Sequence, residues 1–142
     1  MRAGCLGCEA DPPGGVILDT DHWRVEHTIG ALGVGTLIVK PRRHVLHVGD
    51  LSDDEAAELG PLLRDVSRVA QELNGADQVY VCLWSHAGGV PCHIHFVVQP
   101  VRAGTTPHGP KLQVALFDRD EPPDADAAAD VAERARRLLA RR

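Results

Sequence analysis

The sequence predicts a fold that combines strands with helices, and three features support this prediction. Residues 90–100 (VPCHIHFVVQP) alternate as in a strand, which places His93 and His95 on one face. Residues 52–75 carry apolar side chains at helical spacing, and a second helical pattern begins at Asp126.

Composition and charge limit the classes of function. The 142 residues, 44% of them apolar, suffice for one packed core, and we expect a single domain over residues 1–142. A net charge of −5 and a pI near 5.9 argue against a surface for nucleic acid. There is no apolar run of about 18 residues and no signal-peptide pattern, so we expect no membrane partner and a cytoplasmic location.

Further stretches before residue 85 have the pattern of strands. Residues 16–19 and 23–28 are short, partly alternating runs that suit an antiparallel hairpin. Residues 36–40 (TLIVK) are more apolar and precede Pro41, so we expect an inner strand that ends there. Residues 78–84 (QVYVCLW) are apolar on both faces, which predicts a central strand.

The clearest helix begins at Ser52, where Ser52-x-x-Glu55 forms a capping box. Its apolar spacing continues to Gly75, the expected end. Pro61 lies inside this pattern and lacks a backbone donor, which predicts a kink or a break after the second turn.

Residues 101–142 form a C-terminal extension. Within it, residues 111–117 fit a short helix or an edge strand. From Asp126 onward an apolar face predicts a terminal helix, with arginines toward its end that match the helix dipole. That face consists of Ala128, Val131, Ala132, Ala135, Leu138 and Leu139.

Two histidines on one face of a strand are unusual, because a half-buried strand normally carries Val, Thr or Ile there. They indicate a metal site, a phosphoryl-transfer site or a structural pair of buried polar groups. The other histidines at positions 22, 27 and 108 have no evident partner, and we expect them in solvent-facing or loop positions.

A second constellation lies in the N-terminal segment, residues 1–15. Cys5-x-x-Cys8 has the spacing that lets two thiolates share one tetrahedral zinc ion, with two further ligands from elsewhere. A reduced, metal-free pair and a reversible disulfide are the alternatives.

The order of these motifs resembles a known family. CLGC, IVKPRRH, a capped helix, an apolar strand, a Gly-Gly loop and HIHFVVQP are similar to the histidine-triad (HIT) superfamily over residues 5–100. That superfamily includes nucleotide hydrolases, nucleotidyl transferases and galactose-1-phosphate uridylyltransferase. The resemblance implies an α+β, HIT-like fold: an antiparallel sheet of about five strands with one long helix packed on it, here followed by the C-terminal helix. It also implies a homodimer and a site for the α-phosphate of a nucleotide.

The family motif is His-φ-His-φ-His-φ-φ, where φ is apolar. His93 takes its first position and His95 its second, which is the nucleophile in the family. Val97 takes the third position, where most branches keep His, and Val cannot donate a hydrogen bond. Gln99 lies on the same face, about 6–7 Å further along the strand, and is an alternative donor.

The family's usual phosphate-binding residues before the triad are also changed. Instead of Gly-Gln-Ser/Thr, this loop reads SHAGGVPC over residues 85–92. Ser85, His86 and the backbone amides of Gly88 and Gly89 are the remaining candidates for binding phosphate.

The resemblance also implies a complete ligand set for a structural zinc ion. In zinc-containing members the ligands are a Cys-x-x-Cys pair, the His of Pro-x-x-His and the first triad His. These positions correspond to Cys5, Cys8, His44 and His93, and such a site would tie residues 1–15 to the sheet. His47 is an alternative to His44.

Three functions remain open. The first is a nucleotidyl hydrolase or transferase that acts at the α-phosphate of a nucleotide conjugate through a covalent nucleotidyl-histidine at His95. The second is a zinc-stabilised nucleotide- or anion-binding module with little turnover. A catalytic metal site of the cupin type is the third, but it would need a Glu shortly after His95, and this strand continues Val97-Val98-Gln99-Pro100.

Overall fold

The structure is a computed structural model that describes residues 2–87, 90–104 and 109–142. Its strands are β1 (Val16–Asp19), β2 (Trp23–His27), β3 (Leu37–Pro41), β4 (Gln78–Ala87) and β5 (Val90–Val101). The α-helices are α1 (Leu6–Glu9), α2 (Asp53–Asn74), α3 (Leu112–Phe117) and α4 (Ala125–Leu139), with short 3₁₀ turns at Val48–Asp50 and Gly109–Lys111. Among the described residues, no helix is long and apolar enough to cross a membrane.

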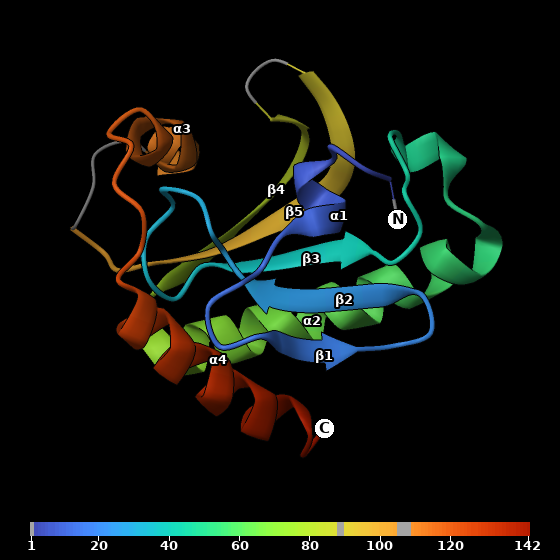
Figure 1. The fold of residues 1–142 in the computed structure, drawn as a ribbon. Coiled ribbons are helices and arrows are strands. Elements are labelled where there is room, and N and C mark those ends of the chain that lie inside the picture. The colour runs from blue at the N-terminus through green and yellow to red at the C-terminus, as the bar shows by residue number, and fades with distance from the viewer. Residues whose placement is uncertain (1, 88–89, 105–108) are drawn as a thin grey trace.

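The strands form one antiparallel sheet in the order β1-β2-β3-β5-β4, as expected for the α+β fold (Figure 1). The N-terminal hairpin and the inner position of β3 are both confirmed. The prediction for residues 78–84 is wrong, because β4 lies at the edge of the sheet, with Val81 and Leu83 41% and 42% exposed. Apolar residues on both faces do not reveal how many neighbours a strand has.

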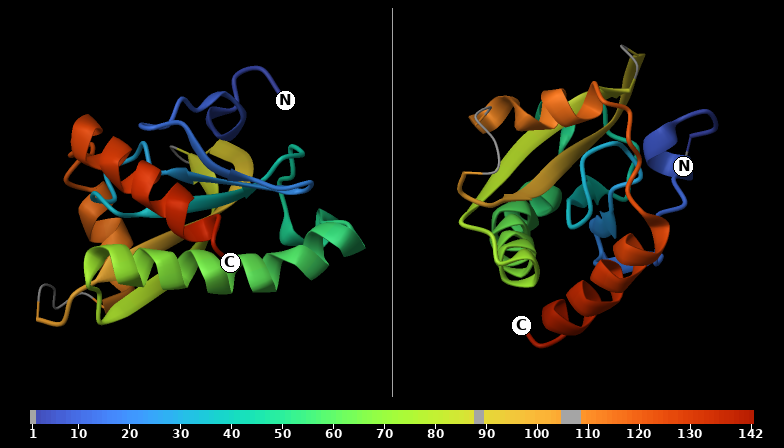
Figure 2. Two further views of the ribbon diagram at one scale, coloured as in Figure 1. Left: turned by 90° about the horizontal axis from the view of Figure 1, so that it is seen from below. Right: turned by 90° about the vertical axis from the view of Figure 1, so that its left-hand side faces the viewer.

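One face of the sheet packs against α2 and α4 and forms the main core (Figures 1 and 2). Trp23 is fully buried there, and its indole Nε1 donates to the carbonyl of Glu55 at 2.9 Å. The opposite face carries α1, which contacts β5 (Figure 1). The terminal helix α4 packs on α2 and β1, so it lies on the side of the sheet away from α1.

Helix α2 has the predicted ends. Ser52 and Glu55 form the reciprocal capping box, and Gly75 adopts a left-handed conformation with φ of 55°. The helix does not break at Pro61, which is exposed to solvent. On an exposed face the carbonyl that loses its partner can bond to water, and the apolar contacts of the buried face hold both halves in line.

The structure also decides the conformation of residues 112–117 and the position of His27. Residues 112–117 form a helix, not an edge strand. His27, expected at a solvent-facing or loop position, is instead fully buried. Its Nδ1 donates to the carbonyl of Thr28 at 2.8 Å, and its Nε2 accepts from the amide of Gly35 at 2.9 Å. The ring thereby connects Thr28 and Gly35, which lie at the two ends of the loop between β2 and β3.

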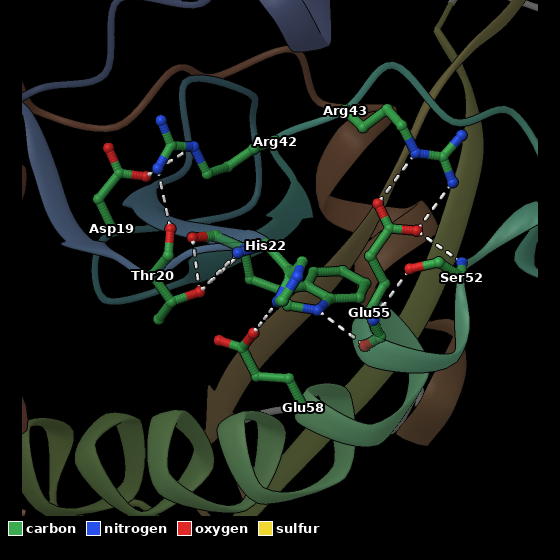
Figure 3. Close-up of polar contacts among 9 residues, drawn as sticks. Asp19, Thr20, His22, Arg42, Arg43, Ser52, Glu55 and Glu58 are labelled. Carbon is green, nitrogen blue, oxygen red and sulfur yellow. Dashed lines mark hydrogen bonds and ion pairs between the residues drawn. The ribbon is translucent and has the colours of Figure 1, made fainter.

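The segment that follows β3 is anchored by its two arginines (Figure 3). Arg42 donates to the carbonyl of Thr20 at 3.0 Å, and Arg43 donates to both carboxylate oxygens of Glu55 at 2.8 and 3.0 Å. Hydrogen bonds from Arg43 lower the pKa of Glu55 from 4.5 to about 2, against the opposing effect of burial. The carboxylate therefore fastens this segment to the start of α2.

We expect Glu55→Gln to be less stable than the wild type by about 1 kcal/mol at pH 7, since Arg43 is half exposed. Because folding lowers the pKa of Glu55, its contribution is complete above pH 4.5 and is lost as the pH falls towards about 2. Urea unfolding of metal-free protein at pH 7 and about pH 3 checks this, with Glu121→Gln, at an exposed position, as control. An equal stability difference at both pH values would contradict it.

Candidate functional site

The end of β3 brings His44 beside the histidine strand. After Pro41 the chain leaves the sheet for three residues, and the carbonyl of Val45 then accepts from the amide of Ile94 at 2.9 Å. This contact places the rings of His44 and His93 edge to face, with centroids 5.5 Å apart. The two histidines meet although they are far apart in sequence.

The N-terminal cysteines reach the same place through α1. This single turn lies against β5, and Gly7 packs directly on His93. A Cβ built on Gly7 would be 2.5 Å from the Cβ of His93, so no larger residue fits without a shift. The glycine between the cysteines thus permits the close approach of the CLGC turn to the strand.

The four predicted ligand residues converge. One ligand atom from each of Cys5, Cys8, His44 and His93 lies within 4.8 Å of all the others. The Sγ of Cys8 is 3.2 Å from Nδ1 of His44 and 3.4 Å from Nδ1 of His93. Tetrahedral zinc bonds of about 2.3 Å to sulfur and 2.0–2.1 Å to nitrogen separate such atoms by about 3.5 Å. The cluster therefore has the dimensions and donors of a structural zinc site, whereas His47 is exposed.

The protonation states suit a metal. Burial lowers the pKa of His93 to about 4, with a further contribution from the charges of His44 and Lys40, so the imidazole is neutral at pH 7. Burial raises the pKa of Cys5, but hydrogen bonds from the backbone amides of His93 and Cys8 outweigh it, and the net shift is downward. Neutral imidazoles and thiolates are the forms that bind metal.

Strand β5 is irregular where it carries these residues. Trp84 pairs with His95 and His86 pairs with Pro91, so residues 92–94 lie opposite Ser85 alone. Such a bulge changes the direction of side chains relative to simple alternation. At this bulge the side chains have different surroundings. His93 faces the cysteines, whereas Cys92 and His95 line a neighbouring cavity.

His95 is held in one tautomer. Its Nδ1 is 3.0 Å from the carbonyl of His93 and must donate, because a carbonyl only accepts. The Nε2 atom therefore carries a lone pair, and burial lowers the pKa of the ring, which favours the neutral form. A neutral imidazole with a free Nε2 can act as a nucleophile.

The cavity beside His95 has a volume of about 450 Å³. Its walls are largely apolar, and the rings of Trp84 and Phe117 lie 5.4 Å apart. The indole of Trp84 donates to Gln113 on α3 at 2.9 Å, which fixes its position. The apolar lining consists of Leu6, Ala10, Ile29, Leu32, Ile38, Trp84, Cys92 and Phe117. An apolar cavity with a few polar groups is typical of a small-molecule site.

Two charged residues of this cavity were missed by the sequence analysis. Lys40 and Glu26 form an ion pair of 2.5 Å with side chains only 7% and 5% exposed, and both line the cavity with His95. Burial raises the pKa of Glu26, although the bond from Lys40 opposes this. The available signal was limited to Lys40, a charged residue at the end of the apolar strand LIVKP, because β2 (WRVEH) carries other polar residues beside Glu26.

The predicted phosphate-binding residues do not all lie together. His86 lines the cavity, and its Nδ1 is 3.5 Å from Oγ of Ser85. Gln99 is buried against the loop after β2, where its amide donates to the carbonyl of Leu32 at 3.2 Å, and it lines a separate cavity of about 280 Å³. Gly88 and Gly89 lie outside the described residues.

No protein-family model matches this chain, and no curated protein does. Solved structures do match. A zinc-bound histidine triad family protein from Mycobacterium smegmatis has a TM-score of 0.70 at 20% identity, over 97% of this chain and 94% of that one. A hypothetical histidine triad nucleotide-binding protein from Sulfolobus tokodaii has a TM-score of 0.70 at 17% identity, over 96% and 89%.

The NitFhit protein of C. elegans has a TM-score of 0.68 at 23% identity. The match covers 90% of this chain but 28% of that larger one. All three similarities are at low sequence identity and concern the fold. The chain therefore has the fold of these histidine-triad proteins, and it carries a Cys-Cys-His-His cluster able to hold a metal ion.

Proposed function

We propose that this protein is a nucleotide-binding hydrolase or nucleotidyl transferase that acts at the α-phosphate of a nucleotide conjugate. The observation that carries the proposal is the tautomer of His95, whose Nε2 is free beside an apolar cavity while Nδ1 donates to the carbonyl of His93. The similar structure from Sulfolobus tokodaii is described as a histidine triad nucleotide-binding protein, which supports the same ligand class.

In the proposed reaction Nε2 of His95 attacks the α-phosphorus and forms a P–N bond. The bond from phosphorus to the leaving group breaks, and the leaving group keeps the electron pair and takes a proton from solvent. Water or another acceptor then attacks the phosphorus and gives its proton to solvent, while the P–N bond breaks and its electron pair returns to Nε2, which restores the neutral imidazole. The His93 carbonyl stabilises the positive charge that the ring bears in the intermediate.

The second candidate is a binding module with little turnover. It is favoured by Val97, which occupies the third triad position and is fully buried in an apolar cluster with Leu32 and Ile38. Such a side chain offers no donor to a phosphate or a leaving group. In the enzyme this loss slows the reaction, and in the binding module it removes the reaction.

The two candidates are separated by trapping the intermediate. Incubation with nucleoside phosphoramidates and dinucleotides is expected to give an acid-labile nucleotidyl adduct on the wild type, detected by intact mass, and none on His95→Ala. His22→Ala serves as control, because His22 bonds to Glu58 outside the cavity, and it should form the adduct normally. If no adduct or product forms while a ligand still raises the melting temperature, the binding module is the correct function.

We further propose that the Cys-Cys-His-His cluster binds Zn²⁺ as a structural ion. It contributes no step to the reaction and holds the N-terminal turn on β5. The support is the set of donors and spacings at Cys8 together with the zinc-bound neighbour from Mycobacterium smegmatis.

Elemental analysis is expected to find about one zinc ion per wild-type chain and almost none in Cys8→Ser. The melting temperature should fall in this variant and in wild type treated with a chelator, since binding free energy of a structural metal contributes to folding. Cys82→Ser, outside the cluster, should keep its zinc. Full zinc content in Cys8→Ser would refute the ligand assignment.

We also propose a cytoplasmic homodimer. All four cysteines are unpaired, which fits a reducing compartment. The edge strand β4 presents Val81 and Leu83 to solvent, and an exposed apolar edge favours pairing with a second copy.

The dimer has a direct test. Light scattering after gel filtration should give the mass of two chains for the wild type and of one chain for Leu83→Lys. Val114→Lys, at an exposed apolar site on α3, should stay dimeric. A wild type with the mass of one chain at all concentrations would exclude the dimer.

A further inference from the structure

The ion pair between Glu26 and Lys40 lies directly beside the triad histidine. Strands β3 and β5 pair Ile38 with Val97 and Val39 with Phe96. Continued by one residue, this antiparallel register sets Lys40 opposite His95 on the same face of the sheet. The β-carbons of such cross-strand neighbours are about 5 Å apart. The side chains of Lys40 and His95 line the same cavity, which agrees with this proximity.

Stability does not explain why this pair is present. Removing an ammonium and a carboxylate from water costs several kcal/mol each, and apolar residues of similar size often replace a buried pair without loss. The neighbouring residues Ile38 and Leu32 show that this face accepts apolar side chains. A charged pair at the wall of a ligand cavity points to a polar ligand instead.

The chemistry of the pair matches the group that His95 would attack. An ammonium has three donors, and the recorded side-chain partner of Lys40 is a single oxygen of Glu26. Glu26 restrains the otherwise flexible side chain of Lys40 at one position. While the cavity is empty, the opposite charges of the two residues give the pair a net charge close to zero. A phosphoryl oxygen next to Nε2 of His95 would meet a fixed positive donor in a poorly hydrated site, where such contacts are strong.

We propose that Lys40, held in place by Glu26, binds the anionic phosphoryl group at His95 and supplies the donor that Val97 no longer provides. The inference rests on the function proposed above and refines it. The favoured ligands have an apolar or aromatic part for the cavity wall and an anionic phosphoryl group at the histidine. Glu26 is a positioning residue, whereas Lys40 contacts the substrate.

Titration calorimetry with AMP, GMP, CMP and UMP, each paired with its uncharged nucleoside, tests the proposal. The wild type should bind at least one nucleotide tenfold or more tighter than its nucleoside, the size expected for a charged hydrogen bond. The double variant Glu26→Gln/Lys40→Met removes the pair without leaving a buried lone charge, and it should lose this preference and form the His95 adduct more slowly. Nucleoside affinity should be unchanged, which a merely structural role of the pair would not predict.

Three further variants complete the experiment. Glu26→Leu/Lys40→Met is made in parallel as a second uncharged replacement, so that the test does not depend on the folding of one protein. Lys40→Arg keeps the charge and should retain most of the preference. Arg64→Met serves as the control, because Arg64 lies on α2, is bound to Asp65 and does not line the cavity. It should behave as the wild type.

The two levels of the proposal fail in different ways. If the wild type binds no nucleotide and forms no adduct, the proposed function is wrong, and the role of Lys40 with it. If the wild type binds and reacts but a folded double variant keeps the preference for nucleotide over nucleoside, only the role of Lys40 is refuted.

Discussion

The pairing of β3 with β5 is the constraint on which both the core and the site depend. The register that joins Leu37 to Val98 turns their side chains toward α2 and α4. On the opposite face Lys40 and His95 line the same cavity. A separate hydrogen bond from the amide of Ile94 to the carbonyl of Val45, outside this register, accompanies the approach of His44 to His93. A slip of one residue would exchange the two faces and remove the cavity, the metal cluster and the core together.

Local signals made much of this structure predictable. The capping box at Ser52 and the glycine at position 75 define α2 through short-range bonds, and the confirmed hairpin needs only alternation and a turn. The position of β4 at the edge, the uninterrupted helix at Pro61 and the burial of His27 were not predicted. Each depends on which other segment packs there, and a single stretch of sequence does not contain that information.

The same distinction between local signals and tertiary packing applies to the candidate site. Motif spacing identified Cys5 and Cys8, and the family resemblance added His44 and His93, which lie in short recognisable motifs; the four residues converge on a metal-sized centre. The pair of Glu26 and Lys40 has no motif, since its residues come from two strands and become neighbours only through the sheet register. Gln99 is the opposite case. Alternation places it on the same face of β5 as His95, but its side chain lines another cavity. Alternation assigns a face, but tertiary packing decides which side chains share a cavity.

The short helix α1 belongs to two sites at once. Cys8 and the flanking Cys5 form half of the Cys-Cys-His-His cluster, while Leu6, Gly7 and the flanking Ala10 form part of the cavity wall. A metal ion that fixes this turn also completes the wall, and a ligand packed on the wall holds the cysteines near their histidines. Thermodynamic reciprocity then requires that each raise the affinity for the other by the same factor. If metal and ligand bind as proposed, the fraction of cavities that hold ligand would rise and fall with the supply of metal.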